Sequence, residues 1–118
     1  MKHEIRMSLA LEADLHRFTV ALLKKLRASV LSYHHPAGMR GDPRRKNIMK
    51  NMGARSGVAD FIVIVGGKAN YLELKKPGGQ LSPDQLKFKA DAELAGCRYM
   101  VADNENEVTE YLKAIGAM

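Results

Sequence analysis

The feature that most restricts the fold of this chain is a run of β-branched and aromatic residues, Phe61–Val65, followed by Gly66-Gly67 and an alternating segment, Asn70–Lys75. Residues of these types favour strands, and paired glycines between two such runs are typical of a hairpin turn. The first run has the composition of a buried strand. The sequence therefore predicts a hairpin in which a buried strand pairs with an alternating one.

Helical and strand patterns flank this hairpin. From Leu9 to about Ala28 apolar residues recur at helical spacing, in a stripe made of Leu11, Leu15, Phe18, Leu22, Leu23 and Leu26. Val30–His34 and Arg98–Ala102 have strand composition. Lys46–Met52 is expected to form one or two helical turns that end at Gly53, anchored by its methionines.

Two further helices are predicted from their caps. Ser82 is followed by a proline at the first helical position and a glutamine at the third, and Gly96 ends this helix. The expected core face of this helix is Leu86, Ala90 and Leu94. A last helix should start near Asp103 or Asn104, with Glu107 in a capping box. Its expected core face consists of Val108, Tyr111, Leu112 and Ile115. The order α-β-β-β-α-β-α predicts an α/β fold with a mixed β-sheet flanked by helices.

Composition places the chain among globular proteins. It has 118 residues, 46% hydrophobic and 27% charged, which predicts one domain over residues 1–118. A single cysteine, Cys97, can form neither an internal disulfide nor a zinc cage. No apolar run is long enough to cross a bilayer, and the first residues lack a signal-peptide core. We therefore expect a cytoplasmic protein with no membrane partner.

The net charge of +6 is concentrated in one segment. Residues 40–55, called the basic segment below, contain one acid, Asp42, and six cationic residues: Arg40, Arg44, Arg45, Lys46, Lys50 and Arg55. Such a cluster suggests a polyanion, and we expect these six side chains to bind nucleic acid. The alternative is a solvated loop whose charges serve solubility.

Asp60, Glu73 and Lys75 are expected to lie together at one end of the hairpin. A four-residue loop, Gly66–Ala69, would pair Asp60 with Lys75, and opposed or alternate residues share a face. Carboxylates bind Mg²⁺, and a nearby ammonium stabilises charge that develops on a phosphate, so the group suits phosphodiester cleavage. The Leu74 carbonyl could add a further oxygen ligand. The alternative is a surface salt bridge between strands.

These residues also carry a family resemblance. Asp60, twelve intervening residues, Glu73-Leu74-Lys75 and then Gln85 resemble the core of the PD-(D/E)xK nucleases, whose fold is like that of restriction endonucleases. Within that superfamily the chain is similar to the VRR-NUC (virus-type replication-repair nuclease) family, in its stand-alone phage or bacterial form. The matching segments are Gly53–Phe61, Tyr71–Lys75, Gly79–Gln85, Glu12 and His34-His35-Pro36.

The resemblance covers the chain from about residue 9 to residue 113, with two departures. Ala59 stands where the family usually has proline, which removes backbone stiffness but no functional group. His16 stands where many members have glutamine, so the role of that position is open.

The resemblance implies a role for each site residue. Asp60, Glu73 and the Leu74 carbonyl would bind Mg²⁺, with Mn²⁺ as a substitute, and Lys75 would orient or activate the attacking water. Gln85 would position Lys75 or the DNA, although Ser82-x-x-Gln85 is also a capping box. Glu12 is a further candidate for binding the metal or its water, but a carboxylate near a helix start is also favoured by the helix dipole.

The expected function is therefore a metal-dependent DNA endonuclease of a bacterial or phage-infected cell, with no small-molecule cofactor. The stand-alone family members are similar to Holliday-junction resolvases, so we expect a homodimer that cuts four-way junctions, which are themselves nearly two-fold symmetric. Two alternatives stay open: a nucleic-acid-binding module without catalysis, and a nuclease that cuts plain duplex DNA.

Overall fold

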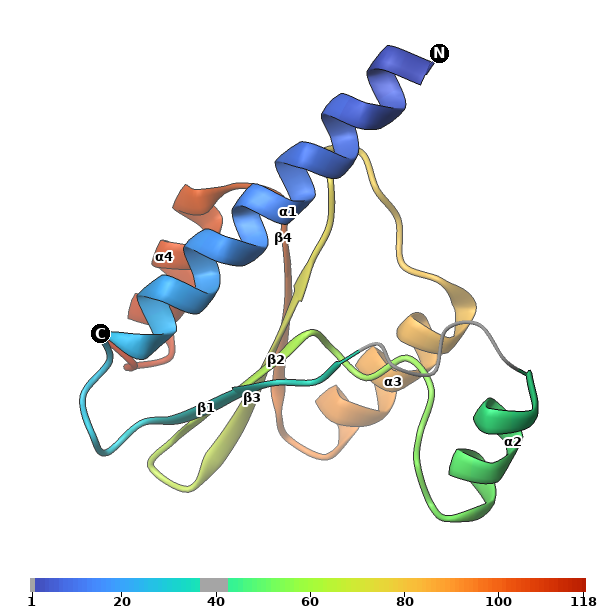
Figure 1. Cartoon of the computed structure of the whole chain (residues 1–118). Helices are drawn as coiled ribbons and strands as arrows, with labels where there is room; N and C mark the ends of the chain where they lie inside the picture. Colours follow the sequence, from blue (N-terminus) through green and yellow to red (C-terminus); the bar gives the residue numbers. More distant parts are fainter. Residues whose placement is uncertain (1, 37–42) are drawn as a thin grey trace.

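The computed structural model describes residues 2–36 and 43–118 (Figure 1). In chain order the elements are α1 (Lys2–Lys24), β1 (Leu31–His34), α2 (Pro43–Asn51), β2 (Phe61–Val65), β3 (Lys68–Leu74), α3 (Pro83–Leu94), β4 (Arg98–Ala102) and α4 (Glu105–Ala114). Compared with the prediction, α1 starts and ends earlier, and α2 is a complete helix. Within the described residues, none of the helices is both long and apolar enough to span a membrane.

The four strands form one mixed sheet in the order β1-β2-β3-β4. The first three are antiparallel neighbours, whereas β4 runs parallel to β3 because α3 carries the chain back along the sheet. The predicted mixed sheet flanked by helices is therefore confirmed.

Helices cover both faces of the sheet (Figure 1). One face packs against α1 and α4, in a core that includes Leu15, Phe61, Leu72 and Leu112. The other face packs against α3 around Phe88, whose ring meets those of Tyr71 and Tyr99. These two apolar layers hold the ends of β2 and β3, from which the polar site described below projects.

The hairpin between β2 and β3 has a shorter loop than expected. Gly66 and Gly67 have φ values of 58° and 78°, the left-handed conformations that a two-residue turn requires, and Val65 pairs directly with Lys68. The expected four-residue loop, and with it the pairing of Asp60 with Lys75, is wrong. The observed register would instead continue to Asp60 opposite Glu73. Because the shift is an even number of residues, the two carboxylates still share a face.

The core face predicted for α3 is also wrong. Leu86 and Leu94 are 55% and 89% exposed, and Ala90 is exposed as well, whereas Phe88 and Ala92 are buried. The Phe88 ring instead packs against Tyr71 and Tyr99 of the sheet, and this aromatic contact turns the Phe88 side of the helix inward.

The predicted cap of α3 is complete, whereas that of α4 differs in one hydrogen bond. Ser82 and Gln85 form the full capping box of α3. On α4 the cap is Asn104, and Glu107 reaches back to the backbone N–H of Asp103. The inward residues Val108, Tyr111 and Leu112 are buried as expected, and Ile115 packs partly against the same core.

Candidate active site

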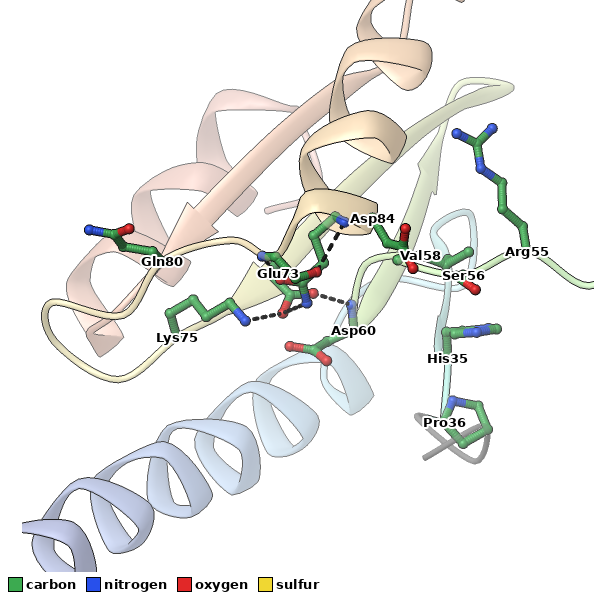
Figure 2. A pocket seen from close by; sticks show the side chains of 13 residues that line it. His35, Pro36, Arg55, Ser56, Val58, Asp60, Glu73, Lys75, Gln80 and Asp84 are labelled. Carbon is green, nitrogen blue, oxygen red and sulfur yellow. Dashed lines mark hydrogen bonds and ion pairs between the residues drawn. The ribbon is translucent and has the colours of Figure 1, made fainter. Parts of the chain in front are cut away.

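A cavity of about 380 Å³ opens where β2 begins and β3 ends (Figure 2). Its walls come from the segment after β1, from residues 55–60, from the end of β3 and from the start of α3. The lining includes four of the predicted catalytic side chains, Asp60, Glu73, Lys75 and Gln85. The structure therefore gathers at one cavity residues that are far apart in the sequence.

The carboxylates of Asp60 and Glu73 each accept a hydrogen bond from the backbone of the neighbouring segment. The Asp60 N–H donates to Glu73 Oε1 at 3.1 Å, and the Leu74 N–H donates to Asp60 Oδ2 at 2.8 Å. These two bonds continue the β2–β3 pairing by one step beyond the last backbone pair, Phe61 with Leu72. Each carboxylate is thus held by a backbone donor of the neighbouring strand.

Glu73 is a buried acid with several donors. Its side chain is 4% exposed; besides the Asp60 N–H, it accepts from Gln85 Nε2 at 3.1 Å and lies 3.5 Å from Lys75 Nζ, both at Oε2. Burial, and after it the negative charge of Asp60, raises the pKa of Glu73 from 4.5 to about 7, against the opposing effect of Lys75. Without a metal ion beside it, this carboxyl is therefore partly protonated near neutral pH.

Gln85 forms the predicted capping box and also reaches the buried acid. Its Oε1 accepts from the Ser82 N–H at 2.9 Å, as the capping box requires, while its Nε2 donates to Glu73. The amide therefore ties the first turn of α3 to the acid on β3. It touches Glu73 rather than Lys75.

The backbone carbonyl of Asp60 receives two hydrogen bonds from the segment that follows β1. His34 donates from Nδ1 at 2.8 Å, since a carbonyl oxygen only accepts, and the His35 N–H donates at 2.7 Å. The His34 ring in turn packs edge-on against His16 of α1, with 4.7 Å between ring centroids. Burial, and then the charge of His34, lowers the pKa of His16, against the opposing effect of Asp60 and Glu12.

Gly57 allows the loop before β2 to pass over the start of α3. Its φ is +80°, and a Cβ atom there would lie 2.3 Å from the Asp84 carbonyl oxygen. No residue with a side chain fits that space without moving the backbone. This contact sets the distance between the loop that leads to Asp60 and the helix that carries Gln85.

Two carboxylates of the cavity fit a divalent cation with oxygen ligands. Asp60 and Glu73 are adjacent, and Leu74, whose carbonyl is the third predicted ligand, follows Glu73 directly. Among the described residues no group of three or more His, Cys, Asp or Glu side chains could hold a metal ion. The set therefore suits Mg²⁺, which commonly binds through one or two carboxylates and keeps several waters, and it does not suit zinc.

Glu12 lies beside this cavity rather than in its wall. It is on α1, one turn before His16, and its charge acts on that histidine. Figure 2 shows α1 passing below Asp60. Its predicted role as a metal or water ligand stays a prediction.

The basic segment divides into three parts. Arg40 lies outside the described residues. Arg44, Arg45, Lys46 and Lys50 are on α2, where Arg44 and Lys50 are exposed. Arg55 reaches the cavity wall, but its guanidinium pairs with Asp91 and lies 5.2 Å above the ring of Phe88. That arginine therefore has a structural contact in addition to its predicted one with nucleic acid.

The sequence interpretation assigned no role to three residues that the structure places at or near the site. Ser56 and Asp84 line the cavity, and the buried Ser56 hydroxyl has no hydrogen-bond partner in the described structure. Tyr99 is buried on β4, and burial, followed by the charges of Glu73 and Asp60, raises its pKa. The matching segments contained Ser56 and Asp84, whereas nothing in the sequence pattern set Tyr99 apart from a core tyrosine.

Two solved structures share this fold. One, described as a VRR_NUC domain, superposes on 87% of this chain and 95% of its own with a TM-score of 0.62 and 17% sequence identity. The other, described as a VRR_NUC domain protein, superposes on 86% of this chain and 84% of its own, with a TM-score of 0.67 and 18% identity. No family model matches the sequence, and no curated protein matches it. The chain has the fold of VRR-NUC domains, which confirms the predicted fold.

Proposed function

We propose that this chain, which has the fold of VRR-NUC domains, is a metal-dependent nuclease that hydrolyses phosphodiester bonds of DNA. The observation that carries the proposal lies where β2 begins and β3 ends. There Asp60 and the buried Glu73 each accept a hydrogen bond from the backbone of the neighbouring segment, and the ammonium of Lys75 lies 3.5 Å from Glu73. A structural role would account for the ion pair of Lys75 with Glu73. It does not account for the second carboxylate, Asp60, whose negative charge raises the pKa of Glu73. A bound divalent cation would account for both carboxylates, because it offsets their two negative charges.

The residues of the cavity divide the work of such a reaction. Asp60, Glu73 and the Leu74 carbonyl would hold Mg²⁺ or Mn²⁺, which supplies Lewis acidity toward the phosphate and lowers the pKa of a bound water. Lys75 lies beside this set, where its ammonium can orient the attacking water or stabilise charge developing on the phosphate. Gln85 keeps Glu73 oriented from α3. Burial of Glu73 strengthens each of these electrostatic interactions.

The decisive experiment is cleavage of DNA with Mg²⁺ by the wild type and by Glu73→Ala. We expect the variant to lose at least a hundredfold in rate, and to lose binding of Mn²⁺ in a calorimetric titration. Glu110→Ala is the matched control, since Glu110 forms an exposed ion pair with Lys113 on α4, away from the cavity. Cleavage by Glu73→Ala at the wild-type rate would refute the assignment.

The contacts to the Asp60 carbonyl provide an independent test of the metal site. His34→Ala removes a side-chain donor to that carbonyl, whereas His35→Ala keeps its backbone donor and removes only the ring. Groups that orient metal ligands typically contribute tenfold to a hundredfold to metal affinity. We expect His34→Ala to weaken Mn²⁺ binding by about tenfold and His35→Ala to leave it nearly unchanged. If the two variants changed Mn²⁺ affinity equally, the hydrogen bond from the His34 ring to the Asp60 carbonyl would not contribute to the metal site.

We further propose branched DNA as the substrate and a homodimer as the active form. Two identical sites related by a two-fold axis suit a four-way junction, which is itself nearly two-fold symmetric. Light scattering on and off DNA, and cleavage of a four-way junction against its linear arms, test these two statements separately. A monomer under all conditions would refute the homodimer, and equal cleavage of the junction and its arms would favour a nuclease for plain duplex.

A binding module without catalysis is the second candidate function. It is favoured by the pairing of Lys75 with Glu73, which such a protein would retain as a structural contact. The two candidates differ in metal binding: a module that contacts phosphates through the basic segment needs no cation at Asp60 and Glu73. The Mn²⁺ titration described above therefore also separates them.

A further inference from the structure

Helix α2 stands apart from the body of the protein. In Figure 1 it lies at the edge of the molecule remote from α1 and α4, and no other helix or strand of the described chain packs extensively against it. Both of its connections nevertheless begin at the cavity. Pro36, before the helix, and Arg55, after it, each line the cavity wall. Only residues 52–54 therefore separate the end of this helix from the cavity wall.

The helix combines positive charge with unpartnered apolar side chains. Its nine residues include Arg44, Arg45, Lys46 and Lys50 and no acid. Ile48 is 58% exposed and Met52, just beyond the helix, is 79% exposed. The Met52 N–H donates to the Ile48 carbonyl at 3.1 Å, so Met52 lies one helical turn beyond Ile48 on the same side. Met52, one of the residues expected to anchor the basic segment, is therefore exposed instead.

Charge decides what covers this apolar pair. If a second copy of the chain docked here through the same surface, it would bring together two α2 helices that each carry four cationic residues and no acid, which is unfavourable. Nucleic acid offers the opposite charge in its phosphates and an apolar surface in the faces of its bases. Proteins that bend or open DNA commonly place Ile, Leu or Met side chains against base steps, with cationic residues on the flanking phosphates.

We propose that Ile48 and Met52 contact unstacked bases of a nucleic-acid substrate while the cations of α2 bind its phosphates. This inference rests on the proposed function for the nature of the polyanion, and it adds the basis for substrate choice. Stacked base pairs in a continuous duplex do not present their faces, whereas bases at a branch point, gap or frayed end do. The helix therefore favours substrates with interrupted stacking next to the scissile phosphate.

The test compares Ile48→Ser/Met52→Ser with Lys50→Ala as the matched control. Affinity is measured by fluorescence anisotropy in EDTA, which prevents cleavage, on a four-way junction and on a linear duplex of the same sequence. A 2-aminopurine at the branch reports on unstacking. We expect the double variant to lose at least tenfold in affinity for the junction and less than threefold for the duplex. Its binding to the junction should not raise the fluorescence of the 2-aminopurine. Lys50→Ala should weaken both complexes by a similar factor, because a phosphate contact is independent of stacking.

Each other outcome overturns the proposal. Equal losses on the two substrates would show that the apolar pair does not read base stacking. A double variant that changes the mass measured by light scattering without DNA would show that the pair covers a second copy of the chain instead. Because both side chains are exposed, the fold should tolerate the substitutions. If the double variant does not fold, the single variant Met52→Ser, which changes the more exposed side chain, is measured in its place. Anisotropy without metal is independent of cleavage, so a failure of the nuclease proposal leaves this result interpretable.

Discussion

The raised pKa of Glu73 predicts how removing its charge changes stability with pH. In Glu73→Gln, measured without divalent cations, the titrating carboxyl is absent while a side chain of similar size remains. In the wild type this carboxyl has a pKa of about 7 in the folded state and an ordinary value of 4.5 when exposed. The folded protein therefore binds more protons than the unfolded chain between these two values. Its contribution to stability is fully present below pH 4.5 and is lost as the pH rises through 7.

The magnitude follows from that difference. Between pH 5 and pH 8 the titration of Glu73 removes roughly 2 to 3 kcal/mol from the free energy of unfolding of the wild type. The groups facing Glu73 are Asp60, Lys75, Gln85 and Tyr99, and all four remain in the variant. The stability of Glu73→Gln relative to wild type should accordingly rise by roughly 2 to 3 kcal/mol over this range.

Urea unfolding at several pH values, in EDTA, measures this difference. The absolute stabilities need not match, since glutamine changes the hydrogen bonds with Gln85 and Lys75. The relevant quantity is the change in the difference between the two proteins with pH. A constant difference from pH 5 to pH 8 would show that Glu73 titrates normally, and it would refute the account of a carboxyl held near the charge of Asp60.

Two further predictions concern the contacts that position α3. Gly57→Ala should cost more than the 1–2 kcal/mol typical of a left-handed alanine, because its Cβ would also meet backbone, whereas Gly53→Ala, at φ +95° in open space, should cost only that amount in thermal unfolding. Gln85→Ala and Ser82→Ala should each lower stability by about 1 kcal/mol through the cap, but only the former, which also loses the bond to Glu73, should weaken Mn²⁺ binding in calorimetry. Equal metal affinities would reduce Gln85 to a capping residue.

The pairing of the hairpin shows what the sequence could and could not predict. Alternation along a strand specifies the face on which a side chain lies, and this was enough to bring Asp60 and Glu73 together. It does not specify the position along the partner strand, which the loop length determines. Gly66 and Gly67 can both adopt positive φ, so the chain turns in two residues and Lys68 joins the strand.

Helix α3 illustrates a second limit. Leu86, Ala90 and Leu94 form one series at helical spacing, and Phe88 and Ala92 form another. Periodicity cannot choose between two such series, because the choice depends on Tyr71 and Tyr99, which come from two different strands. The capping box was predictable for the opposite reason: all of its partners lie within four residues of one another.

The reciprocal bonds between Asp60 and the end of β3 have a practical consequence for spectroscopy. Two backbone amide protons, those of Asp60 and Leu74, are donated to the two carboxylates of the site. Their chemical shifts therefore respond to the charge of Glu73 and of Asp60, respectively, without any label in the cavity. In an amide-correlation spectrum these two resonances would follow proton release and cation binding at the two acids separately, and so assign each event to a single side chain.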